Sequence, residues 1–237
     1  MVKLYVKSFV DCPMTNSATA PGQTARQVNK ERRRQKILSV ARDIIASQGF
    51  DAFTVSELAS RSGVTIPTVH NLFGKKHDIV LELFRELVSR VDQVLAQPDL
   101  VDPIAALETF IDDLVALYSA DEAFYRAAFL GGERLGLFEH EMSDGIFKKS
   151  LKVAERLCAQ AHENGHLEGK LNRRWMAEQL FNTQRMARQD WVSGYIDLKR
   201  YRQQALIGML MTYAADATPD FHRRVCAKID DVARVRA

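Results

Sequence analysis

Apolar residues recur at helical spacing along most of this chain. Between residues 30 and 48, apolar side chains lie three or four positions apart, and Gly49 follows them as a helix terminator. A second long periodic stretch covers residues 76–96. After Pro103, no segment alternates apolar and polar residues with the period of two that marks strands. The pattern predicts an all-α fold.

Two interruptions divide this pattern into three parts. Ser, Thr, Ala, Pro and Gly dominate residues 15–24, and Pro98 and Pro103 break the apolar spacing further along. We expect a disordered leader, an N-terminal domain with a long linking helix, and a helical C-terminal domain. Their expected bounds are residues 1–29, 30–97 and 98–237.

The C-terminal domain is expected to consist of helices alone. Glycines at 131, 132 and 136 predict a loop after the second of these helices, and Asn164 and Gly165 end the third. The expected helices cover residues 104–119, 121–130, 141 or 143 to 163, 173–194, 197–215 and 220–234.

Two short helices joined by a tight turn are predicted between residues 54 and 73. Thr54 is placed to cap the first helix, and Glu57 follows three residues later as in a capping box. Gly63 suits the left-handed backbone at the end of that helix. Thr65 is placed to cap the second helix, with Pro67 in its first turn. This arrangement is typical of a helix-turn-helix, although any helical hairpin shares some of these signals.

Positive charge is concentrated around this motif. Residues 26–78 contain ten Lys and Arg against five Asp and Glu, whereas residues 79–237 contain 21 against 24. Seven of the basic residues lie between Arg26 and Arg42, with Glu31 as the one acid among them. Alone, such a run is typical of a solvated face or a flexible tail. Beside a helix-turn-helix it indicates contacts with phosphates.

Residues 34–84 resemble the N-terminal domain of the tetracycline-repressor (TetR) family of transcription regulators. The chain departs from the usual residues of that family at His70, where a tyrosine is common, and at Leu72, Lys75 and His77. The residues that match in order and spacing are Ile37, Ala41, Gly49, Phe50, Thr54, Val55, Ile66 to Phe73, Lys76 and the apolar stretch from Ile79.

The resemblance implies that residues 65–73 form a recognition helix in the major groove and that Lys76 holds a phosphate. The side-chain chemistry agrees, since Asn71 suits a bidentate contact with adenine, and Ile66 and Thr68 offer apolar surface to a thymine methyl. The expected DNA-binding residues are Arg34, Thr54, Thr65, Ile66, Thr68, His70, Asn71, Lys75 and Lys76.

The segments 173–194 and 197–215 carry more apolar residues than one narrow buried stripe needs. Part of this surplus fills the core, and the rest favours a second buried face against a partner chain. The resemblance implies a homodimer in which these two helices form a four-helix bundle across a two-fold axis. It also implies that the C-terminal domain binds a small-molecule effector. The aromatic and methionine content suits an apolar or aromatic effector, and no pocket residues are assigned.

Other features restrict the location of the protein. Cys12, Cys158 and Cys226 are odd in number and far apart, which favours a reducing cytoplasm over a disulfide framework. No apolar run reaches the roughly 18 residues of a transmembrane helix, so no membrane partner is expected. Residues 1–14 do not match a signal peptide, and Met14 is an alternative start.

Residues 162–166 read HENGH, which formally matches the zinc-protease motif. That chemistry needs both histidines on one helical face, whereas Asn164 and Gly165 are helix terminators. We therefore expect no enzyme, no metal and no cofactor. The expected function is a sequence-specific DNA-binding transcriptional regulator, a repressor released by an effector and acting as a homodimer on a palindromic operator. A helical zinc hydrolase using HENGH and a helical adaptor that does not bind DNA are the alternatives.

Overall fold

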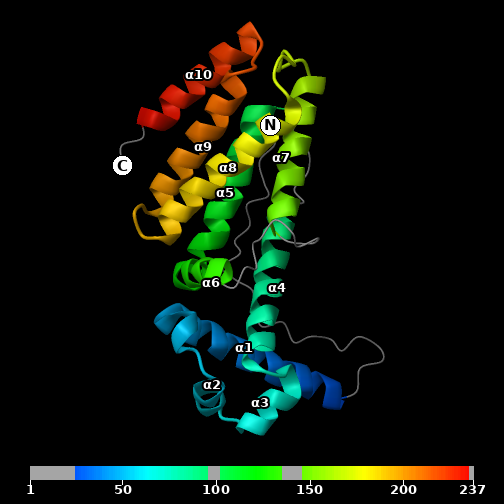
Figure 1. Ribbon diagram of the computed structural model, residues 1–237, viewed down its shortest axis with the longest axis vertical. Helices are drawn as coiled ribbons and strands as arrows, with labels where there is room; N and C mark the ends of the chain where they lie inside the picture. Colours follow the sequence, from blue (N-terminus) through cyan, green and yellow to red (C-terminus); the bar gives the residue numbers. More distant parts are fainter. Residues whose placement is uncertain (1–24, 96–101, 135–145, 235–237) are drawn as a thin grey trace, which may run out of the picture.

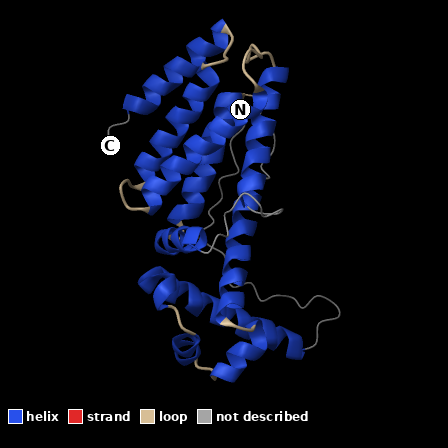
Figure 2. Cartoon of the chain, viewed as in Figure 1, coloured by secondary structure: helices blue, strands red, loops and turns tan. Residues whose placement is uncertain are grey.

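The computed structural model describes residues 25–95, 102–134 and 146–234 (Figure 1). Every regular element in these ranges is a helix, which confirms the all-α prediction (Figure 2). They are α1 (Ala25–Ala52), α2 (Val55–Ser62), α3 (Ile66–Phe73), α4 (Lys76–Leu95), α5 (Pro103–Ser119), α6 (Glu122–Arg134), α7 (Ile146–Glu163), α8 (Arg173–Val192), α9 (Leu198–Ala214) and α10 (Pro219–Arg234).

The helices form a small head and a larger body (Figure 1). Helices α1, α2 and α3 make the head at one end, and α4 rises from it to the body. In the body α8 packs between α7 and α9, while α10 covers another side of α9. Helix α6 lies across α1, so the body touches the head directly as well as through α4. Within the described ranges, no helix is both long enough and apolar enough to cross a bilayer.

The helical periodicity of α1 buries one of its faces in the head. Ile37, Ala41, Ile44 and Ile45 are completely buried there, and Phe53 closes the same core. Each large aliphatic or aromatic side chain buried in this way stabilises the head by about 1.5–3 kcal/mol. This apolar face leaves the opposite face of α1 to solvent.

Helix α1 differs from its prediction at both ends. It begins at Ala25, so residues 25–29, which were expected in the leader, are helical. The remainder of the expected leader lies outside the described residues. Near its other end, Gly49 has φ 80° and ψ 173°, so this residue interrupts the helix where the sequence predicted it to stop.

Two glycines predicted to form a loop lie instead inside α6. A Cβ atom on Gly131 would lie 2.2 Å from Cδ2 of Phe50, so the missing side chain lets α6 approach α1 closely. Gly132 is also buried in this helix, whereas Gly136 lies outside the described residues. Phe50 stacks on Phe84 of α4 at a centroid distance of 5.5 Å. The glycine therefore marks a contact between head and body.

A buried carboxylate after α9 binds the loop between α7 and α8. Asp216, which is 3% exposed, accepts hydrogen bonds from the backbone N–H groups of Gly169 and Lys170, both at 2.9 Å, and of Leu171 at 3.2 Å. The loop between α7 and α8 is thereby tied to the end of α9. Leu167 and Ala217 form an isolated bridge beside this contact.

Because α6 approaches α1 closely at Gly131, we expect a methyl group added at this position to destabilise the protein. Gly131→Ala should destabilise the protein by about 1–3 kcal/mol, because the Phe50 ring must move to admit the Cβ. Chemical denaturation measures this change, with Phe50→Leu as the reference background. In that background the same substitution should cost less, because the smaller side chain leaves room. A Gly131→Ala variant as stable as the parent would contradict the contact.

Candidate nucleic-acid interface

Local capping residues build the helix-turn-helix. The hydroxyl of Thr54 accepts a hydrogen bond from the Glu57 N–H at 3.2 Å, and the Thr65 hydroxyl accepts one from the Thr68 N–H at 3.4 Å. Gly63 ends α2 in the left-handed region, with φ 68°. The Glu57 carboxylate accepts a hydrogen bond from the Gln48 side chain at 3.0 Å. Of the two hydrogen bonds of the predicted capping box, the described structure therefore gives the one to the Thr54 hydroxyl.

Helix α3 presents a polar face to solvent. Val69 is completely buried against the head, whereas His70 and Asn71 are exposed and Ile66 is 42% exposed. Thr68 is half-buried, and its hydroxyl lies 2.9 Å from that of Thr65. The helix therefore offers an amide, an imidazole, hydroxyls and one apolar side chain, which are the groups that read base edges in a major groove.

Arg34 makes contacts with α3 and α4. Its guanidinium donates to the Leu72 carbonyl and pairs with Glu82 of α4, and it lies 4.4 Å from the centroid of the Phe73 ring. These contacts tie α1 to α3 and α4. These contacts give Arg34 a role in holding the head together, and its role as a DNA-binding residue stays a prediction.

The outer face of α1 borders an open groove beside α3. This groove has a volume of about 990 Å³, and Arg32, Arg33 and Lys36 line it together with Thr65 and Thr68. The three cations are exposed, and none of them takes part in an ion pair within the described residues. Cations left facing solvent beside hydroxyl groups make a surface suited to phosphates.

The buried wall of the groove contains a further polar atom. Ser62, at the end of α2, is 2% exposed, and its hydroxyl has no hydrogen-bond partner in the described structure. Arg32, Arg33 and Lys36 belong to the basic run from which phosphate contacts were expected, whereas no sequence signal pointed to Ser62. A usable signal was present for the cations, because residues 29, 32, 33 and 36 share one face of a helix.

The remaining predicted residues lie near the start of α4. Lys75 and Lys76 are exposed, and the Lys76 ammonium lies 5.7 Å from the Phe53 ring centroid. The Asp78 carboxylate accepts from the Lys75 N–H at 2.7 Å, which caps the helix. His70 Nδ1 lies 2.6 Å from the Gly74 carbonyl oxygen. Because that oxygen only accepts, Nδ1 carries the proton, and Nε2 is left for another contact.

Comparison with known proteins agrees with this surface. Residues 37–83 match the sequence profile described as bacterial regulatory proteins of the tetR family. Residues 37–83 therefore carry the DNA-binding domain of the TetR family. The chain is accordingly a transcription regulator with a DNA-binding helix-turn-helix, and not an enzyme.

Two relatives and one solved structure illustrate this similarity. The fatty acid metabolism regulator protein of Bacillus subtilis is 22% identical over 151 residues, which cover 62% of this chain and 77% of that protein. The HTH-type transcriptional activator FasR of Mycolicibacterium smegmatis is 26% identical over 136 residues, covering 56% and 58%. A TetR-family regulator from Marinobacter aquaeolei has the same fold, with a TM-score of 0.63, 19% identity, and coverage of 84% of this chain and 98% of that one.

The HENGH segment of this chain does not have the geometry of a zinc site. Helix α7 ends at Glu163, so His166 lies beyond it and packs on the Phe221 ring at 4.8 Å. His162 instead packs against Gly169, where a Cβ would lie 2.6 Å from Nε2. Among the described residues, no group of three metal-binding side chains occurs.

Two neighbouring arginines should respond differently to the same substitution. Arg34→Met should lower the free energy of unfolding by about 1–3 kcal/mol, because it leaves Glu82 without its partner. Arg33→Met should change stability by no more than about 0.5 kcal/mol, because its side chain is exposed. It should instead flatten the dependence of log affinity for DNA on log salt by about one unit.

Urea denaturation and DNA titrations at several salt concentrations measure both effects in the same preparations. An unaltered salt slope for Arg33→Met would remove that residue from the phosphate surface. Unchanged stability of Arg34→Met would contradict its structural role.

Proposed function

We propose that this regulator acts as a homodimer on a palindromic operator and is released from it by a small molecule. The proposal rests first on one observation, the exposed polar face of α3 beside a row of exposed cations on α1. The cytoplasm, where bacterial DNA lies, is the corresponding location.

Each exposed group on the head has a chemical role in this proposal. Asn71 pairs with an adenine edge through its amide, and Ile66 contacts a thymine methyl. Lys75 and Lys76 contact phosphates from the start of α4, as the groove cations do from α1. The imidazole of His70 contacts the DNA through Nε2, since Nδ1 is occupied by the Gly74 carbonyl.

The body exposes apolar side chains that support a two-fold dimer. Trp175 and Met186 are 68% and 62% exposed on α8, and Met211 is 60% exposed on α9. The first two lie three helical turns apart, so they share one face of α8. An isolated head buries too little surface to bind DNA specifically, and two heads about 34–36 Å apart read both halves of a palindrome.

A chain of contacts between head and body supports control by an effector. Glu86 of α4 accepts from Arg42 of α1 at 2.6 Å and from Arg90 at 2.8 Å. The Arg42 guanidinium lies 5.3 Å from the centroid of the Phe124 ring of α6. Movement of α6 in the body therefore changes the position of α1. These contacts of α1 with α4 and α6 form the junction between head and body. An effector acts through this junction only if it binds more tightly to one of two states of the dimer that differ in the distance between the heads.

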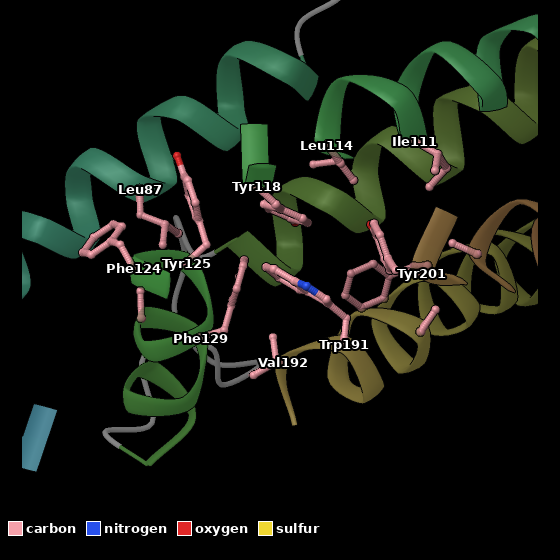
Figure 3. Packing of buried hydrophobic residues seen from close by; sticks show 14 of the residues in the cluster. Leu87, Ile111, Leu114, Tyr118, Phe124, Tyr125, Phe129, Trp191, Val192 and Tyr201 are labelled. Carbon is pink, nitrogen blue, oxygen red and sulfur yellow. The ribbon is translucent and has the colours of Figure 1, made fainter. Parts of the chain in front are cut away.

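The effector is proposed to be largely apolar, because aromatic side chains dominate the body core next to the junction (Figure 3). One relative of the chain is named as a regulator of fatty acid metabolism. That name is compatible with an apolar effector here.

Operator selection tests DNA recognition directly. The full-length protein is used to select bound fragments from a random duplex library, and affinities are then measured for the selected site and its single-base variants. Asn71→Ala should lose about tenfold or more of the discrimination at one or two positions, since one bidentate base contact contributes about 1–3 kcal/mol. Lys75→Ala serves as the comparison, because loss of a phosphate contact weakens all sites similarly. Unchanged base preference in Asn71→Ala would rule out its proposed role.

A charge on the exposed face of α8 tests the dimer. Met186→Glu should shift the protein from dimer to monomer in sedimentation velocity, because a two-fold axis brings an uncompensated charge into each half of the buried face. Met186→Leu keeps the apolar surface and should remain dimeric. A Met186→Glu variant that still sediments as a dimer, or a monomeric parent protein, would exclude this interface.

A further inference from the structure

One arginine among the described residues of the body is buried and forms no ion pair with them. Arg188 of α8 is 8% exposed, and its guanidinium carbon lies 4.6 Å from the centroid of the Phe129 ring on α6. None of the ion pairs formed by the described residues includes it. A buried guanidinium cannot escape the cost of desolvation by losing its proton, because arginine stays protonated in proteins.

The groups around Arg188 are aromatic rings and neutral oxygens. Tyr118 stacks on Trp191 with a centroid distance of 5.0 Å, and Phe129 meets the edge of Tyr118 at 5.5 Å (Figure 3). Burial raises the pKa of the Tyr118 hydroxyl, and the neighbouring Arg188 guanidinium opposes that shift. One turn earlier on α8, Gln184 donates to the Tyr201 hydroxyl at 2.8 Å. Within the described structure, Arg188 thus faces oxygens that carry no negative charge at neutral pH.

Another arginine near this cluster is paired in the usual way. Arg126 of α6 binds the Glu122 carboxylate at 2.9 Å, and Glu122 also accepts from the Trp191 indole N–H at 3.1 Å. The Glu122 carboxylate, which contacts Trp191 of this cluster, is therefore already occupied. A buried cation without an anion costs several kcal/mol relative to a paired one, so such a residue is a strong site for a bound anion.

We propose that Arg188 binds the charged group of the effector and that the effector is an apolar carboxylate. This inference rests on the proposed function, because it identifies the chemistry of the effector-responsive body. The planar fork of an arginine matches the two oxygens of a carboxylate, and the rings of Tyr118, Phe129 and Trp191 supply apolar walls for the remainder of the ligand. The Tyr118 hydroxyl donates a further hydrogen bond to the same carboxylate.

A series of contacts runs from Arg188 through α6 to the head. Phe129, whose ring covers the guanidinium, lies two residues before Gly131 on α6. Gly131 contacts Phe50, which stacks on Phe84 of α4. A carboxylate that takes the place of the Phe129 ring on Arg188 therefore displaces α6 at the point where it touches the head.

Matched pairs of ligands test the charge requirement in the full-length dimer. The probes are 4-phenylbutanoate and decanoate, each compared with the alcohol of the same carbon skeleton. Binding is measured by calorimetry and by the increase in the thermal unfolding midpoint. Trp175→Phe leaves Trp191 as the single tryptophan, so a change in its fluorescence reports binding beside Arg188. The carboxylates should bind and change this fluorescence, and the alcohols should bind much more weakly.

Substitution of the arginine tests the site. Arg188→Met should reduce carboxylate affinity by at least ~30-fold and abolish the preference over the alcohol, since truncating one partner of a buried charge pair has at least this effect. Without ligand, the same variant should unfold at an equal or higher temperature, because an unpaired buried charge has been replaced by apolar volume. Arg174→Met, at an exposed position of the same helix, is the matched control and should leave ligand binding unchanged. If Arg188→Met does not fold, Arg188→Lys should retain the preference for the carboxylate with reduced affinity.

Three results would overturn the inference. The first is an equal increase of the parent protein's thermal unfolding midpoint by carboxylates and alcohols. The second is an Arg188→Met variant that keeps the preference for the carboxylate, and the third is no binding of the carboxylates at all. Operator binding by the same preparations separates these results from a failure of the proposed function. Protein that binds its operator but not the carboxylates would refute only the effector chemistry.

Discussion

The packing of α1 is the constraint on which the rest of the structure depends. One face of this helix fills the head core, and its flank is held by the pair between Arg42 and Glu86 and by the Phe50 contact with Gly131. The opposite face carries the exposed cations of the groove. Because a single helix carries both surfaces, any shift of α6 or α4 moves the groove cations as well. In the proposed function, regulation by an effector therefore needs no separate transmitting element.

The parts of the fold that could be predicted from the sequence are those set by nearby residues. The caps of α2 and α3 depend on Thr54 and Thr65 and on backbone groups three residues away, so local spacing was sufficient. The sequence predicted a loop at the glycines of α6, whereas Gly131 lies in a helix and makes room for the Phe50 ring. That ring is about 80 residues earlier in the chain, so no local pattern shows the contact. The contacts of Arg34 could not be predicted for the same reason, since its partner Glu82 lies on another helix. Sequence spacing gives the face of a helix, but not what packs against that face.

Charge is distributed between the two domains in different ways. In the head, Arg34 and Arg42 are paired with Glu82 and Glu86, whereas the groove cations Arg32, Arg33 and Lys36 form no ion pair among the described residues. In the body, the opposite arrangement occurs at Arg188, which is buried and has no anionic partner in the part of the chain that the structure describes. Exposed cations cost little and attract phosphates at long range, whereas a buried cation is costly until an anion arrives. The first arrangement suits a large polyanion, and the second suits one small anion.

These two anion sites would be coupled through α6 and α1. If a carboxylate on Arg188 weakens operator binding by some factor, the operator must weaken carboxylate binding by the same factor, because binding free energies are reciprocal. A coupling of 1–3 kcal/mol is typical and corresponds to roughly 5–150-fold. The contacts that carry it are few: the Phe129 ring on Arg188, Gly131 on Phe50, and Phe50 on Phe84. Since Gly131 allows no slack against Phe50, a small displacement of α6 is transmitted to α1 rather than absorbed between them.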